Sequence, residues 1–350
     1  MIDFRYHLVS IVAVFLALAI GIVLGATQLQ RQTVDVLQST SNSLRNQLSA
    51  ASAERDSYQA QVGATEQFLQ TAEPTLLGGR LTGQRVVLIT EPGAASSVIG
   101  SVRQAATTAG ATITGQIALQ PKFNDISGAT QSSLDTINGS IASSDNVTLT
   151  PGTAAQTAYQ QQAAQLIAAA ILTKTASTSQ QSSGQQNNGG LTTASANTLL
   201  SAYAQGGYLT VTGSPTGDRA TLAIVVVPAS APSGGQNDPV NQVLIAASQE
   251  FATASAATVV AGTTAGSQQQ GNSISVLRAS SASAQMSTVD DADLTLGQIS
   301  VAEALASQLA GGKPNSYGIS GASAVSPDPL PSPIATASPP QQGKTGKAKK

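Results

Sequence analysis

The chain has 350 residues, a net charge of -2 and only 3% aromatic residues, so nothing in its composition indicates a nucleic-acid partner. It contains no cysteine, which excludes disulfide bonds, thiolate metal sites and cysteine nucleophiles. Its one histidine is His7, so a serine–histidine–aspartate triad or a histidine-based zinc site is not expected in a folded domain that follows. We therefore expect a protein that is not an enzyme.

The first 26 residues carry the strongest signal in the chain. From Leu8 to Ala26 there is no charged residue, and Ser10 is the only polar one. At ~1.5 Å per residue this run spans roughly 28 Å as a helix, close to the ~30 Å hydrocarbon core of a bilayer. A cleaved signal peptide is the alternative, but the apolar run is long for a signal peptide, and Arg5 is the only arginine or lysine that precedes it. The sequence predicts an uncleaved transmembrane anchor over residues 1–27, surrounded by membrane lipid.

The charges that flank the anchor do not decide its orientation, because Arg5 lies on one side and Arg31 and Arg45 lie on the other. Residues 28–350 have no cysteine, few charges and much serine, threonine and glutamine. On this composition we expect a single-pass protein of the cell membrane whose C-terminal domain is extracytoplasmic.

A helical pattern continues beyond the anchor. Between Ala26 and Val62 there is neither glycine nor proline, and positions spaced by alternate threes and fours are mostly apolar. This period of 3.5 is typical of a coiled coil, although Ser41, Arg55 and Thr65 interrupt it. The sequence thus predicts a coiled-coil stalk over residues 28–73. The residues expected at its partner interface are Val34, Leu37, Leu44, Leu48, Tyr58 and Val62.

Gly63 and then Glu73-Pro74 are expected to end this stalk. Three interpretations remain open: the stalk forms a homodimer, it pairs with a helix of another coiled-coil protein, or it is an amphipathic helix on its own domain. Within the anchor, Gly21 and Gly25 form a G-x-x-x-G pair, which lets membrane helices pack closely. This pair agrees with self-association.

Beyond residue 80 the pattern changes to alternating strands and helices. Strands are predicted at 85–90, 111–119, 221–227, 257–261 and 273–277, and helices at 96–109, 153–174, 239–255 and 294–309. Such alternation favours a parallel sheet covered on both faces. The expected fold class is α/β: an N-terminal transmembrane helix and coiled-coil stalk, followed by a Rossmann- or flavodoxin-like parallel-sheet domain over residues 80–318.

Two segments have the composition of irregular chain. Residues 176–190 form a polar low-complexity insert, which predicts a loop. Residues 326–350 are rich in proline and serine, and their last residues include Lys344, Lys347, Lys349 and Lys350. This composition predicts a disordered tail. The basic end could alternatively touch anionic lipid or a cell-wall polymer.

Nucleotide-binding motifs are missing. The segment after the first strand, Glu91 to Ala95, lacks G-x-G-x-x-G, and Gly343-Lys344-Thr345 lacks the earlier glycine and the strand of a Walker A loop. We expect no cofactor.

The one carboxylate cluster comprises Asp290, Asp291 and Asp293. Its oxygens could bind a hard cation such as Ca²⁺ or Mg²⁺, with Asp290 and Asp293 as the candidate ligands. The cluster also precedes a predicted helix, where aspartates cap free N–H groups and favour the helix dipole. Capping is the interpretation that we prefer.

Both ends of the ordered chain carry family-like motifs. The run FRYHLVSIVAVFLALAIGIVLG begins at Phe4, STVDDADLTLGQISVAEALA begins at Ser287, and Asn315-Ser-Tyr317-Gly follows. Over roughly residues 1–318 the chain resembles the actinobacterial MctB family, described as copper transport proteins of the cell envelope. The resemblance implies a role in copper transport or copper homeostasis.

The residue chemistry indicates that this role is indirect. Copper(I) favours cysteine and methionine sulfur and copper(II) favours histidine nitrogen, yet the chain offers only His7, Met1 and Met286. The family also resembles envelope proteins that act through a coiled coil on cell-wall hydrolases during division. The alternative function is therefore a coiled-coil scaffold that regulates such a hydrolase.

Overall fold

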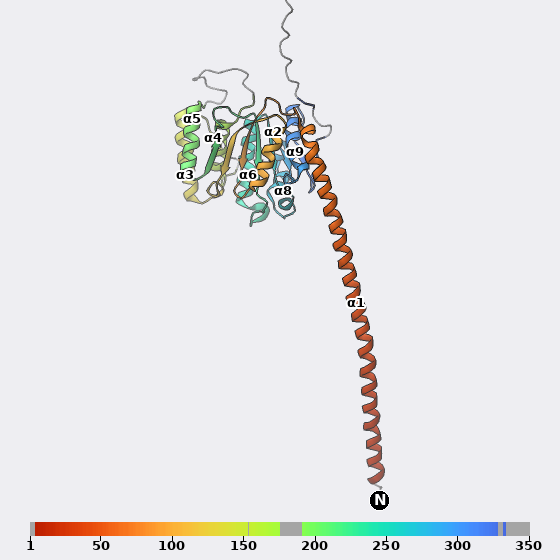
Figure 1. Ribbon diagram of the computed structural model, residues 1–350. Coiled ribbons are helices and arrows are strands. Elements are labelled where there is room, and N and C mark those ends of the chain that lie inside the picture. The colour runs from red at the N-terminus through yellow and green to blue at the C-terminus, as the bar shows by residue number, and fades with distance from the viewer. Residues whose placement is uncertain (1–3, 153, 176–190, 328–331, 334–350) are drawn as a thin grey trace, which may run out of the picture. The chain divides into compact units, whose positions relative to one another are not determined.

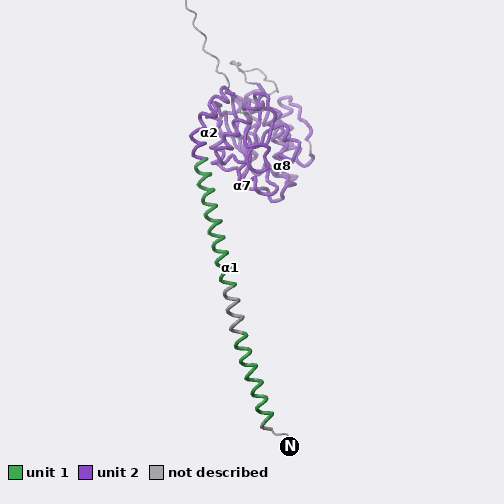
Figure 2. Tube along the Cα trace, turned by 90° about the vertical axis from the view of Figure 1, so that its right-hand side faces the viewer, with its two compact units in different colours: residues 1–65 green, residues 66–350 purple. Residues whose placement is uncertain are grey.

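The computed structural model describes residues 4–152, 154–175, 191–327 and 332–333, without the side chains of residues 4–5 and 26–35. The chain divides into two compact units, residues 1–65 and residues 66–350 (Figure 2). The predicted insert at 176–190 and most of the predicted tail lie outside the described residues.

One long helix, α1 (Phe4–Leu77), makes up the described part of unit 1 and ends within unit 2. The helix itself continues past Gly63 and Glu73-Pro74, the residues expected to end the coiled-coil stalk, and where that stalk ends stays a prediction. A single glycine costs only ~1 kcal/mol relative to alanine inside a helix, which neighbouring turns outweigh. Pro74 removes one N–H close to the helix end, and the helix stops only at Gly78 and Gly79, where Gly79 has a φ of 81°.

Unit 2 is built on a seven-stranded sheet with the order β3-β2-β1-β4-β5-β6-β7. All neighbouring strands are parallel except β2 and β3, which are antiparallel, so the predicted parallel sheet is confirmed apart from one edge strand. The central strands β4 and β5 are entirely buried, as uninterrupted apolar runs require. The strands are β1 (Arg85–Thr90), β2 (Thr112–Leu119), β3 (Leu209–Gly213), β4 (Leu222–Val226), β5 (Ala257–Ala261), β6 (Ser287–Val289) and β7 (Ser316–Tyr317).

Helices cover both faces of this sheet (Figure 1). One face packs against α2 (Ser96–Thr108), α9 (Thr295–Leu309) and Leu77 at the end of α1. The helices on the other face are α3 (Gly128–Asp145), α4 (Ala158–Ile171), α5 (Thr193–Gln205), α6 (Pro239–Ala254) and α8 (Ser273–Ala279). A hydrophobic core lies on each face of the sheet, and alternate side chains of a strand pack into one core or the other. In β1, Val86 and Leu88 pack into one core, and Val87 and Ile89 pack into the other.

The expectation of a strand at 273–277 is wrong, because this segment is helix α8. The Asn272 side chain accepts a hydrogen bond from the Ser275 N–H at 2.8 Å and caps the helix. Ile274 and Leu277, three residues apart, then bury on one face. The helix thus replaces the strand that this short apolar run alone predicts.

The strand order reverses between β1 and β4, as in doubly wound folds. The chain leaves β1 into α2 on one face and leaves β4 through the short 3₁₀ helix η2 (Gly235–Asn237) into α6 on the other. The carboxyl ends of β1 and β4 therefore meet at the edge where ligands bind in such folds.

Candidate functional site

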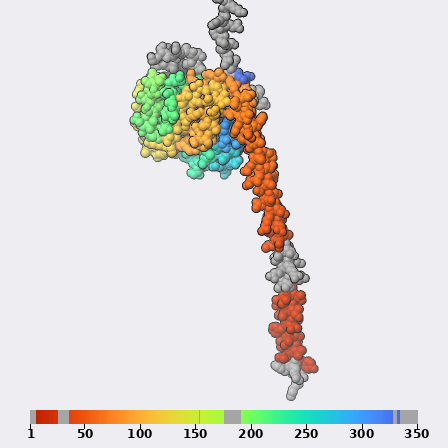
Figure 3. All heavy atoms as spheres, in the orientation of Figure 1, coloured from red at the N-terminus to blue at the C-terminus, as the bar shows by residue number. Residues whose placement is uncertain are grey.

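The apolar start of α1 has the length and composition of a membrane span. Residues Tyr6–Gly25 have a mean hydropathy of 2.9, and none of the most apolar stretch is buried (Figure 3). Twenty residues of helix cover about 30 Å, the thickness of a bilayer core. This finding fits the predicted anchor.

The predicted interface residues on α1, here called the α1 seam, are Leu37, Leu44, Leu48, Tyr58 and Val62. Each is more than half exposed, from 54% at Val62 to 73% at Leu48. Val34, the sixth predicted interface residue, lies outside the described side chains. The coiled coil stays a prediction.

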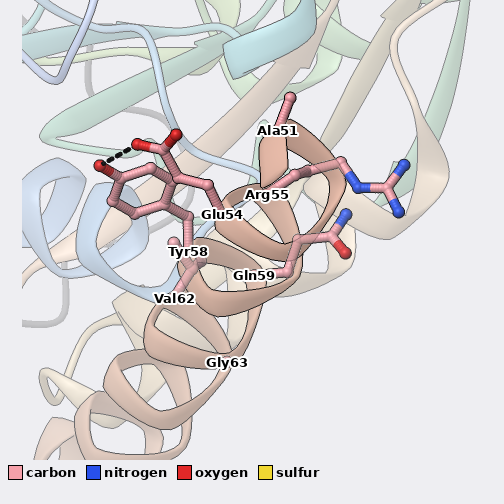
Figure 4. A pocket seen from close by; sticks show the side chains of 7 residues that line it. All are labelled: Ala51, Glu54, Arg55, Tyr58, Gln59, Val62 and Gly63. Atoms are coloured by element: carbon pink, nitrogen blue, oxygen red, sulfur yellow. Dashed lines mark hydrogen bonds between the residues drawn. The ribbon is translucent and has the colours of Figure 1, made fainter. Parts of the chain in front are cut away.

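Two shallow hollows lie along the α1 seam. The larger, of about 610 Å³, is lined by Ala51, Glu54, Arg55, Tyr58, Gln59, Val62 and Gly63 (Figure 4). In it the Tyr58 hydroxyl donates to Glu54 Oε1 at 3.1 Å, and Arg55 pairs with its neighbour Asp56 at 2.7 Å. The smaller, of about 350 Å³, is lined by Leu37, Thr40, Ser41, Leu44, Arg45 and Leu48. Both hollows offer mainly apolar surface to side chains of another helix.

Gly21 and Gly25 leave open space on α1, since a Cβ added at either would meet nothing within 4 Å. The role of this pair in membrane-helix packing stays a prediction. It belongs to the candidate membrane span rather than to the α1 seam.

In the acidic cluster, Asp290 is held by protein groups. Its Oδ2 accepts a hydrogen bond from Arg278 Nη1 at 2.7 Å, and its Oδ1 accepts from the Ile319 N–H at 2.9 Å. The same guanidinium donates to the Tyr317 and Ser320 carbonyls. Asp290 therefore joins α8, β6 and the segment after β7, a role that the sequence did not indicate because Arg278 is not part of the cluster.

Asp293 and Asp291 differ in their surroundings. Asp293 Oδ1 accepts from the Thr264 N–H at 2.7 Å, so it caps the short helix α7 (Thr264–Ser267) rather than α9. Asp291 is buried, and its carboxylate has no hydrogen-bond partner within the described part of the chain. Burial and the neighbouring Asp290 charge raise the pKa of Asp291 to about 6.

The metal role of Asp290 and Asp293 stays a prediction. Their oxygens already accept hydrogen bonds from Arg278 and Thr264. Among the described residues, no group of three or more histidine, aspartate or glutamate side chains is arranged to hold a metal ion.

Glu91 is a buried acid at the carboxyl end of β1, where the strand order reverses. Its Oε2 accepts from Asn124 Nδ2 at 3.1 Å, whereas Oε1 and Asn124 Oδ1 have no hydrogen-bond partner among the described residues. Burial raises the pKa of Glu91 to about 7, and the hydrogen bond from Asn124 only partly opposes this. The sequence signal for this residue is an acid that directly follows a buried strand.

Soft copper ligands are not gathered in the described residues. Met286 is a core residue with 1% of its surface exposed, and Met1 lies outside the described residues. His7 belongs to the candidate membrane span in the other unit. Within each unit, the described residues therefore bring no two soft copper donors together.

Residues 1–327 match the family model described as "Copper transport outer membrane protein, MctB". The proteins named "Copper transporter MctB" from Mycobacterium tuberculosis and Mycobacterium bovis are each 28% identical to this chain over 319 residues, which cover 91% of this chain and 96% of the relative. The protein of that name from Mycobacterium leprae is 27% identical over 323 residues. The similarity thus extends over the helix and the sheet domain together.

Proposed function

The chain belongs to the MctB family, and from that premise we propose that it serves copper transport or copper homeostasis as a membrane-anchored protein of the cell envelope. The observation that carries this proposal is the match of the family model to residues 1–327, which includes both the candidate membrane span and the sheet domain. The relatives of similar length are named copper transporters.

We further propose that the chain acts on copper through a partner and without catalysis. Its donor set lacks cysteine, and its described methionine is buried in the core. The α1 seam is the surface that best suits a partner, because its apolar side chains are exposed and regularly spaced. In this arrangement the anchor lies in the cell membrane and the sheet domain lies outside the cytoplasm.

Intracellular copper in a strain that lacks the chain tests the copper role. At sub-toxic external copper we expect accumulation, reversed by the intact chain but not by a variant with Leu37, Leu44 and Leu48 replaced by Gln. The matched control replaces Ser39, Asn46 and Ala53, seven residues apart along α1 and outside the seam, by Gln, and we expect it to complement fully. Unchanged copper in the deletion strain would remove the support for the copper role.

The exposed α1 seam also favours a second candidate function, a coiled-coil scaffold that regulates a cell-wall hydrolase during division. This function requires the seam but no copper ligand. It predicts chains of unseparated cells in the deletion strain at unchanged intracellular copper. Normal separation of those cells, with copper accumulated, would leave the copper role as the supported one.

A further inference from the structure

We propose that the α1 seam binds a second copy of itself, parallel and in register, and that Arg55 of each copy pairs with Glu54 of the partner subunit. This inference rests on the proposed membrane anchoring, since two copies that enter the same bilayer present their helices in the same direction. It names the partner that the proposed function leaves open.

The spacing of the seam defines which residues face the partner. Leu37, Leu44, Ala51 and Tyr58 recur every seven residues, and Ser41, Leu48, Arg55 and Val62 form a second such series offset by four. These two series are the two core positions of a heptad repeat. The two hollows on α1 both lie along this line, so one continuous helix face can receive a partner's side chains.

Arg55 is the one charged residue in these two core series, and its position determines the favoured arrangement. Arg55 belongs to the series that contains Ser41, Leu48 and Val62. In a parallel, in-register pair, each residue of that series packs beside the partner's residue one position before the equivalent core residue. The residue that precedes Arg55 is Glu54, so each guanidinium meets an opposite charge. In an antiparallel pair centred on this segment, equivalent flanking positions face each other, which places Glu54 near Glu54 of the partner subunit. Charge complementarity therefore favours the parallel pair.

The single helix holds both groups ready for this exchange. Tyr58 orients the Glu54 carboxylate along the seam through its 3.1 Å hydrogen bond, as Figure 4 shows. Arg55 turns sideways to Asp56, an exposed pair whose contribution to stability is small. Across residues 28–65 three arginines and three acidic residues cancel, so two copies do not repel each other. A charged core residue also limits the assembly, because its head group reaches solvent most readily in a dimer.

The glycine pair lies outside this contact. At roughly 100° per residue, Gly21 and Gly25 lie more than about 100° around the helix from the centre of the seam. On a continuous straight helix, the glycine pair and the seam therefore lie on different sides of α1. The seam alone defines the proposed interface.

Single-cysteine crosslinking in membranes tests the arrangement, because the chain has no cysteine of its own. We expect Leu37→Cys, Leu44→Cys and Leu48→Cys each to form a disulfide-linked dimer on mild oxidation. Asn46→Cys and Ser39→Cys, on the opposite side of α1 from the seam, are the controls and should give at least tenfold less dimer. An antiparallel pair would crosslink at one seam position at most. A partner other than a second copy would give no dimer at any of them, and either result would overturn the proposal.

Charge exchange tests the Arg55–Glu54 pairing on the Leu44→Cys background. We expect Glu54→Arg and Arg55→Glu each to lower the dimer yield several-fold, and the double variant to restore it. The matched control is Arg55→Glu with Asp56→Arg, which preserves the pair within one helix and should not restore the dimer. Rescue by this control but not by the Glu54 exchange would show that Arg55 acts only within its own helix.

The outcomes separate this inference from the proposed function. Crosslinked dimers with unchanged intracellular copper would uphold the dimer and remove the copper role. Copper accumulation in the deletion strain without seam crosslinks would uphold the copper role and overturn the dimer. If alkaline extraction released the chain from membranes, the premise of anchoring itself would fail.

Discussion

Glu66 Oε2 accepts a hydrogen bond from the backbone N–H of Thr295 at 2.9 Å, joining the part of α1 in unit 2 to the start of α9 across 229 residues of sequence. The residue at the N-cap position of α9 is Leu294, whose side chain cannot cap. The carboxylate of another helix thus satisfies a free N–H of α9 and faces the positive end of its dipole.

Replacing Glu66 by Ala is expected to lower the free energy of unfolding by about 0.5–2 kcal/mol, the range for loss of an N-cap side chain. Glu66→Gln keeps an acceptor oxygen without the charge, so its loss should be smaller. Denaturant unfolding of the full chain in detergent measures both. The neighbouring exposed Gln67→Ala is the control, and an equal loss for this control would contradict a specific cap.

A second link to α9 comes from the segment after α1, where Arg80 pairs with Glu303. Arg80 Nε lies 3.1 Å from Glu303 Oε1, and Glu303 is fully buried. Burial raises the pKa of Glu303 to about 7, although the Arg80 charge lowers it in part. Arg80→Met should therefore cost about 3–5 kcal/mol at pH 8, because it leaves a buried carboxylate without its counter-charge.

The double variant Arg80→Met with Glu303→Leu removes both charges and should recover most of that loss. Urea unfolding at pH 8 of the parent, the two single variants and the double variant completes the cycle. If the losses in free energy of unfolding of the two single variants added up to that of the double variant, the two side chains would not interact.

The predictable part of the fold is the part that has a local signal. β1, β4 and β5 are uninterrupted runs of branched apolar residues, and α2, α6 and α9 have helical periodicity, so their sequences predict them within a few residues. β6 and β7 have three and two residues, and β3 is mostly exposed. Such strands form because a neighbouring strand offers hydrogen bonds, which no local pattern records.

The side-chain partners of the acidic residues were less predictable for the same reason. The cluster Asp290, Asp291 and Asp293 suggests either a cation or a helix cap for α9. In the structure Asp290 accepts hydrogen bonds from Arg278, Asp293 accepts one from Thr264, and the distant Glu66 accepts the hydrogen bond at the start of α9. These partners are fixed by the sheet topology, which brings together segments that a single sequence cannot pair.

Glu91 predicts a pH dependence of stability. The pKa of its carboxyl group in the folded chain is about 7, above its ordinary 4.5, so the folded state holds the proton more tightly than the unfolded state. The free energy of unfolding therefore falls as pH rises from about 4.5 to 7, by about 3 kcal/mol for this group alone. Below that window Glu91 has no such cost.

Glu91→Gln should remove this contribution. Asp291 and Glu303 titrate in an overlapping range, but they are present in both proteins, so the difference between variant and parent isolates Glu91. Thermal or denaturant unfolding from pH 5 to pH 8 should show the variant gaining stability on the parent as pH rises. A difference that stays constant with pH would contradict a buried, titrating Glu91.

Arg278 and Asp290 lead to a prediction about the acidic cluster. The guanidinium makes hydrogen bonds to Thr288, Asp290, Tyr317 and Ser320, all between 2.7 and 2.8 Å, and the Asp290 carboxylate is fully buried. Arg278→Met should destabilise the chain by about 3–5 kcal/mol, because it leaves buried acceptors and a buried charge unpaired. Arg278→Lys keeps the charge but loses the multiple donors, so it should recover only part of that loss.

The same geometry predicts how the cluster responds to cations. Because Asp290 is already paired, we expect millimolar Ca²⁺ or Mg²⁺ to leave the melting temperature of the parent chain unchanged. The loss of melting temperature caused by Asp290→Asn should likewise be the same with and without the cation. A cation that binds the folded state would instead raise the melting temperature with its concentration. Such a rise, absent in Asp290→Asn and in Asp293→Asn, would establish these two aspartates as metal ligands and Arg278 as the group that the cation displaces.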